Sequence, residues 1–118
     1  MSELKKKAWQ ELLKKEPTDK ELIYIIKYVE SLREEAGQKL LERDPSNEGL
    51  ICIMGHVWSL AEEAWKKFLE QNPTNDDLRD IILRVSSLSS LRDRAGKKLL
   101  EQNPSNDDLC FIMQHCDF

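Results

Sequence analysis

A repeat marked by proline restricts the fold of this chain more than any other feature of its sequence. Four prolines recur at intervals of 28, 28 and 31 residues, at positions Pro17, Pro45, Pro73 and Pro104. Aligned on them, the chain divides into four units, which are residues 8–35, 36–63, 64–94 and 95–118. The third unit is three residues longer because Ser-Ser-Leu is duplicated within 86–91, which we expect to alter the junction between units three and four. A unit this short cannot bury its own apolar face, so neighbouring units must stack.

Each unit is predicted to contain two helices joined at the proline. Residues that cap helix N-termini predict the start of the second helix, at Thr18, Ser46, Thr74 and Ser105. An acid three residues later completes a capping box in every unit except the second, which has Gly49 instead. Similar boxes predict that first helices begin at Ser31, Ser59 and Ser90. We expect each first helix to end at the residue before proline, because the proline ring disfavours helical geometry there.

These patterns predict an all-α fold, a right-handed α-α superhelix (solenoid) of about four helix-turn-helix repeats. Residues 1–118 would form one domain, since only four glycines and four prolines interrupt a chain with 34% charged residues. Apolar residues at helical spacing, such as Leu50, Ile53 and Val57, supply the buried stripe. The sequence resembles helical-repeat proteins of the tetratricopeptide, HEAT and armadillo type. Its 28-residue unit is shorter than theirs and lacks the tetratricopeptide Trp-Leu-Gly-Tyr pattern, so the resemblance implies an architecture and no specific family.

Charge and cysteine content exclude several functional classes. The net charge of −4 does not favour nucleic-acid binding, and no apolar run approaches the ~20 residues of a membrane span. Three scattered cysteines do not form a disulfide framework, so a cytoplasmic protein is the default expectation. The close similarity of the units, with departures concentrated in the second, favours an engineered protein made in a recombinant host.

Two positions in each second helix, four residues apart, change chemistry from unit to unit. We call these eight residues the variable ladder: Tyr24 and Tyr28, Cys52 and His56, Asp80 and Arg84, and Phe111 and His115. Each pair shares one helix face, and stacking would align the pairs along one side of the solenoid. Repeat proteins bind partners along such surfaces, so the ladder predicts an interaction scaffold for a protein or peptide. The alternative is that these positions face solvent and tolerate substitution.

Cys52 and His56 also suggest a second function, hydrolysis of a small ester. An imidazole four residues from a thiol on a helix can accept its proton and activate it. Asp80 in the next unit could orient the imidazole, and Tyr24 or Tyr28 could donate to an oxyanion. Separately, the departures from the common pattern between Gly49 and Trp58 resemble an active site introduced into a regular scaffold, as in an engineered cysteine esterase. Against this, Cys52 lies too deep in its helix to benefit from the positive helix end.

No cofactor is expected, and a metal site is the weakest alternative. Cys110, His115 and Cys116 lie two units from Cys52, which is too far for shared ligation. The last unit carries no polar closing repeat, so we expect Leu99, Ile112 and Phe118 to be exposed unless something covers them. The sequence thus predicts either pairing of copies through their exposed repeat ends or a longer array.

Overall fold

The regular secondary structure of the protein is helical throughout residues 2–85 and 89–116, which are the residues that the computed structural model describes. Its α-helices are α1 (Glu3–Lys14), α2 (Asp19–Tyr28), α3 (Arg33–Leu41), α4 (Asn47–His56), α5 (Ala61–Glu70), α6 (Asn75–Arg84), α7 (Ser89–Glu101) and α8 (Asn106–His115). Short 3₁₀ helices at Glu30–Leu32 and Trp58–Leu60 precede α3 and α5. The prediction of an all-α repeat with two helices per unit is confirmed. The Ser-Ser-Leu duplication lies partly outside the described residues, and its effect stays a prediction.

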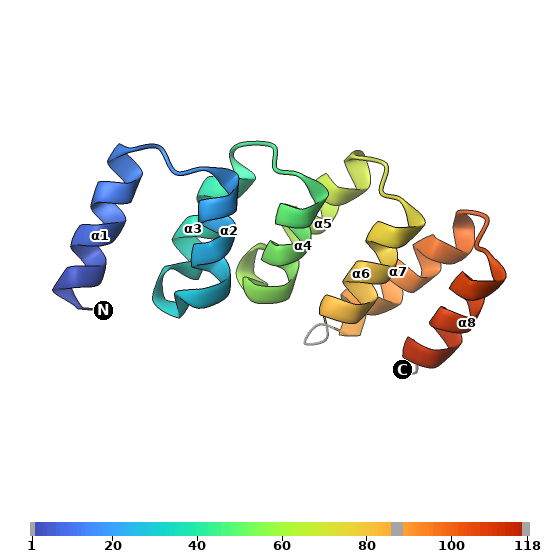
Figure 1. The fold of residues 1–118 in the computed structure, drawn as a ribbon. Coiled ribbons are helices and arrows are strands. Elements are labelled where there is room, and N and C mark those ends of the chain that lie inside the picture. The colour runs from blue at the N-terminus through green and yellow to red at the C-terminus, as the bar shows by residue number, and fades with distance from the viewer. Residues whose placement is uncertain (1, 86–88, 117–118) are drawn as a thin grey trace.

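The helices stack side by side into an elongated molecule, with the two chain ends at opposite ends of the stack (Figure 1). The molecule measures 51 × 24 × 20 Å. The second helices of the units, α2, α4, α6 and α8, form a continuous row in which each packs against the next. This row brings equivalent positions of successive units next to one another, as the ladder hypothesis requires.

The closest helix pairs do not coincide with the units read from the sequence. The most extensive packing joins α2 to α3, α4 to α5 and α6 to α7, so each second helix pairs with the first helix of the following unit. Contacts of α1 with the rest of the fold are sparse by comparison. The buried Trp9 side chain attaches α1 to α3, because its indole Nε1 donates a 2.6 Å hydrogen bond to Glu35 Oε2.

The second helices begin where their capping residues predict. The hydroxyls of Thr18, Ser46, Thr74 and Ser105 each accept a hydrogen bond from the backbone N–H three residues on. Three of these capping residues also donate their own backbone N–H to the acid three residues on, which completes a capping box. These acids are Glu21, Asp77 and Asp108. The α4 start lacks this second bond, as the glycine at position 49 predicts.

The prediction for the first helices was wrong at both ends. Leu32 and Leu60 occupy the N-cap positions of α3 and α5, and no side-chain cap forms there. Both leucines are buried, so core packing of a 3₁₀ turn sets the helix start in place of a serine cap. The Ser59 hydroxyl instead donates a hydrogen bond to Glu34, which lies in the first turn of α3, and Ser90 lies inside α7.

The C-terminal ends of the first helices lie two or three residues earlier than predicted. Between each helix and its proline stands one residue in the left-handed conformation, with φ of 51–55°. These residues are Glu16, Asp44, Asn72 and Asn103. A left-handed residue followed by proline is a common helix ending, and Asn and Asp tolerate this backbone conformation better than Glu does.

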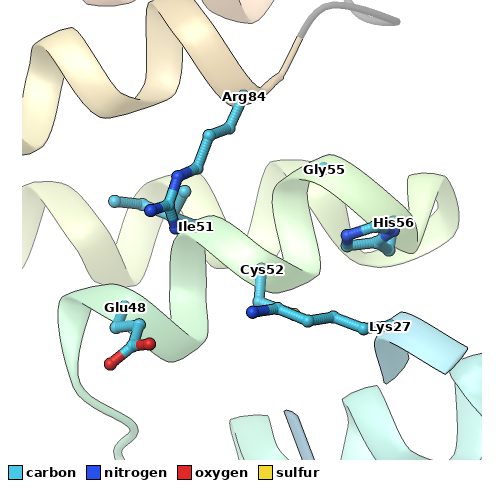
Figure 2. Close-up of a pocket in the computed structure, with 7 residues that line it drawn as sticks. All are labelled: Lys27, Glu48, Ile51, Cys52, Gly55, His56 and Arg84. Carbon is cyan, nitrogen blue, oxygen red and sulfur yellow. The ribbon is translucent and has the colours of Figure 1, made fainter. Parts of the chain in front are cut away.

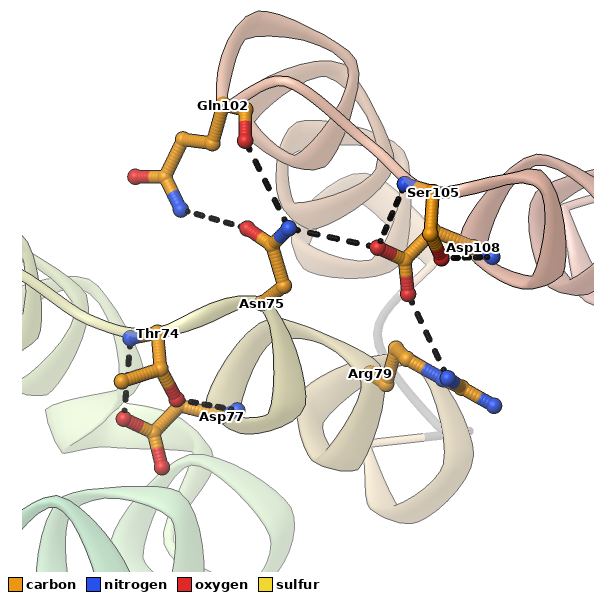
Figure 3. A network of polar contacts seen from close by, with 7 residues as sticks. All are labelled: Thr74, Asn75, Asp77, Arg79, Gln102, Ser105 and Asp108. Carbon is orange, nitrogen blue, oxygen red and sulfur yellow. Dashed lines mark hydrogen bonds and ion pairs between the residues drawn. The ribbon is translucent and has the colours of Figure 1, made fainter.

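Polar side-chain contacts join the turns of successive units, and Figure 3 shows those between units three and four. Gln71 and Gln102 donate from their side chains to the carbonyl oxygens of Pro45 and Pro73, one unit earlier in each case. Gln102 also donates to the side-chain oxygen of Asn75, whose amide nitrogen lies 3.2 Å from Asp108 Oδ2. These contacts fix the spacing of the units at the turn edge of the stack.

The apolar core runs along the stack, as the stripe in the second unit predicts. Leu50, Ile53 and Val57 are buried in it. Leu99, predicted to be exposed at the last unit, is fully buried because α7 packs along α6. Ile112 is partly buried, and Phe118 lies outside the described residues.

Candidate functional site

The pocket that contains Cys52 lies on the row of second helices, where α2, α4 and α6 meet. Its volume is about 290 Å³. It is lined by Lys27, Glu48, Ile51, Cys52, Gly55, His56 and Arg84 (Figure 2). Both predicted residues of the second unit therefore border the same cavity, together with side chains from the units on either side.

Cys52 is almost fully buried, with 7% of its surface exposed. Burial raises the pKa of its thiol to about 11, because the thiolate would lose its hydration. Lys27, Arg33 and Arg84 oppose this rise in the pKa, and Glu48 adds to it. At neutral pH the thiol is protonated, whereas a nucleophilic cysteine needs a low pKa or a base that takes its proton.

His56 lies at the edge of the pocket and is exposed to solvent. Its pKa is lowered first by partial burial and then by the positive charges of Arg33 and Lys27. Among the described residues no hydrogen bond joins Cys52 to His56. Asp80, Tyr24 and Tyr28 do not line the pocket. Within the described residues, the thiol thus has no base in hydrogen-bond contact.

The pocket carries a locally positive charge on a protein whose net charge is −4. The side chains of Lys27 and Arg84 reach toward it from α2 and α6, and Glu48 stands at its rim (Figure 2). Neither cation has an ion-pair partner within the described part of the chain. The pocket therefore has two cationic side chains and a single acidic one around the buried Cys52. This arrangement can accept an anionic group of a ligand, such as a carboxylate.

The remaining positions of the variable ladder differ in exposure. Tyr24 and Tyr28 are 60% and 69% exposed, and their rings contact each other with centroids 4.9 Å apart. Phe111 is buried beneath the guanidinium of Arg79, which lies 4.5 Å from its ring centroid, and packs against the half-buried His115. The first unit therefore presents an open aromatic surface, while the last presents a covered one.

The pocket also includes Lys27 and Glu48, which sequence reasoning missed. Lys27 and Gly55 occupy equivalent positions in the first two units, and the later units have Leu83 and Gln114 there. This position changes chemistry between units as completely as the ladder positions do. The same comparison of units could therefore have identified Lys27. The rim residue Glu48 has no such signal, because acids also stand at its equivalents in the later units.

Comparison of the chain with protein-family models, with curated proteins and with solved structures finds no match. Within residues 2–85 and 89–116, no group of three or more His, Cys, Asp or Glu side chains is placed to hold a metal ion. No helix in the same ranges is long and apolar enough to cross a membrane.

Proposed function

We propose that this chain is a helical-repeat scaffold that binds a peptide segment of a partner protein along its second helices. The observation that carries the proposal is the exposed Tyr24–Tyr28 pair beside a cationic pocket. Tyrosines contribute a large, rigid contact area, and they are enriched among the residues that dominate binding energies. Two such side chains on one helix face provide an apolar contact surface for a partner.

The charge of the pocket defines the chemistry of the bound peptide. Lys27 lies in the last turn of α2, between the two tyrosines in sequence, and reaches into the pocket, where Arg84 faces it from α6. A peptide that crosses α2, α4 and α6 can place an apolar side chain on the tyrosines and an Asp or Glu carboxylate between the two cations. The carboxylate would pair with charges that are otherwise unpaired in the described structure.

The alternative function, ester hydrolysis by Cys52 and His56, has less support. The buried thiol has a pKa of about 11, and no hydrogen bond within the described residues links it to the imidazole. The close similarity of the units is consistent with an engineered origin for the scaffold. A designed origin does not depend on which of the two functions is correct.

Selection from a library of displayed random heptapeptides tests the scaffold proposal. We expect enriched peptides to share an acidic residue and an apolar residue. Their affinity should fall at least tenfold for Tyr24→Ala/Tyr28→Ala and for Lys27→Glu/Arg84→Glu. The exposed Lys66, on α5 and away from the row of second helices, provides the control Lys66→Glu, which should bind normally. Failure to enrich any peptide, or peptides that bind both double variants as well as they bind the unmodified chain, would refute the proposal.

A further inference from the structure

The first and last helices expose apolar residues that are buried at every equivalent position inside the stack. Leu4 in α1 is 81% exposed, whereas its equivalents Leu32, Leu60 and Leu91 are 3%, 9% and 1% exposed. Met113 in α8 is 73% exposed, whereas its equivalents Ile26, Met54 and Ile82 are 0%, 0% and 1% exposed. The same side-chain positions are thus covered in the interior and open at both ends.

The packing inside the stack identifies what covers these positions. Each inner second helix packs most extensively against the first helix that follows it, as α6 does against α7. Among the described residues, α8 is a second helix with no such partner. Within the same described residues, α1 is a first helix that has no second helix packed on its other side. The open faces of α8 and α1 are therefore the two halves of the contact that the fold already makes three times.

From this complementarity we infer that the chain self-associates head to tail, with α8 of one copy packing against α1 of the next as α6 packs against α7. The contact buries Met113 of one copy and Leu4 of the other. It extends the row of second helices across the junction between molecules. Because α1 and α8 lie at opposite ends of a molecule 51 Å long, one partner cannot cover both faces (Figure 1). The interface is heterologous, so assemblies grow beyond two copies, either as an open chain of molecules or as a closed ring.

Charge and hydrogen bonding favour the same arrangement. In the antiparallel packing, the last turn of α1 with Lys14 lies toward the first turn of α8 with the exposed Asp107. At the other end of the contact, Lys5 of α1 is equivalent to Arg33 of α3. The Arg33 side chain donates to the carbonyl oxygens of Ile26 and Lys27 at the end of α2. Lys5 can donate in the same way to the Met113 and Gln114 carbonyl groups of the neighbouring α8, which have no partner within their own helix. The last carbonyl of α8, on His115, already accepts a hydrogen bond from Arg92.

Sedimentation velocity of the 118-residue chain, with no residues appended at either end, tests this inference. We expect the average mass to rise with concentration beyond two chains. A monomer at all concentrations up to about 1 mM, or a mass that stops at two chains, would overturn the inference.

Two variants separate the faces and distinguish this contact from any other self-association. Leu4→Glu disables the α1 face and Met113→Glu disables the α8 face. Both side chains are exposed, so neither change disturbs the core. Each variant alone should be monomeric, and an equimolar mixture should form a one-to-one dimer with about twice the 13.8 kDa mass of one chain. Trp58→Glu, at an exposed apolar residue in the middle of the stack, should assemble normally. A mixture that stays monomeric, or a single variant that still associates, would refute head-to-tail packing.

Discussion

The reactivity of Cys52 toward iodoacetamide decides between a buried structural thiol and a catalytic one. At pH 8 a thiol with a pKa of about 11 is only about 0.1% thiolate, whereas free cysteine with a pKa of about 8.5 is about 24% thiolate. The thiolate fraction of Cys52 is thus about 200-fold smaller. This is partly offset because the nucleophilicity of a thiolate rises with its pKa, along a Brønsted slope of about 0.4–0.5, which makes each Cys52 thiolate roughly 10- to 18-fold more reactive. We therefore expect Cys52 to react at least about tenfold more slowly than a cysteine in an unstructured peptide. Its 7% exposure should slow alkylation further.

Peptide-resolved mass spectrometry across pH 5 to 9 measures this rate in the folded protein. The Cys52 rate should rise about tenfold per pH unit without a plateau, because the thiol stays mostly protonated throughout this range. The exposed Cys110 provides an internal reference for reagent and folding state. A plateau in the Cys52 rate below pH 9 that disappears in His56→Ala would contradict the reasoning. It would instead indicate a thiolate stabilised by the imidazole, as the hydrolase alternative requires.

Two further predictions concern the turns. Replacing Glu16 by Asn should raise the free energy of unfolding by up to about 1 kcal/mol, because Asn tolerates the left-handed conformation (φ 55°) better. The reciprocal change Asn72→Glu should lower the free energy of unfolding similarly, and opposite signs in chemical denaturation would contradict this account. The pKa of Asp108 is lowered, first by the backbone N–H of Ser105. Its stabilising effect is therefore complete above the unfolded pKa of about 3.9 and is lost as pH falls through the lowered folded pKa. Thermal unfolding should show the unmodified chain more stable than Asp108→Asn at pH 6, with the difference disappearing at the lowest pH; a constant difference would argue against this carboxylate's ionisation as the cause.

Local signals in the sequence predicted the second helices well and the first helices poorly. Thr18, Thr74 and Ser105 cap their helices through hydrogen bonds within four residues, so a short stretch of sequence contains all the information needed. The start of α3 instead depends on burial of Leu32, which requires the neighbouring helices to be in place. A serine at position 31 cannot compete with that tertiary contact, since a cap contributes only about 1 kcal/mol.

The sequence predicted which helix face carries the candidate site residues, but not which of their side chains are exposed to solvent. Comparison of the units identified Cys52 and Tyr24 as equivalent residues on the same face. In the structure Cys52 is buried and Tyr24 is exposed, because α4 lies between two other second helices while α2, within the described residues, has such a neighbour on one side. A residue's neighbours in the stack, and not its place in the repeat, determine whether its side chain can bind a partner.

The offset between the sequence repeat and the helix pairs affects how such a chain can be lengthened or shortened. A cut at the start of a sequence unit, before Ala36 or Ala64, falls inside α3 or α5 and so disrupts a helix that belongs to one of the best-packed pairs. A cut at the proline turn leaves every helix pair whole. Excision of residues 18–45 removes α2 with α3 and joins α1 to α4 through a turn of unchanged type. The module that gene duplication or design can shuffle without loss of packing therefore begins at the capping residue after one proline and ends at the next proline.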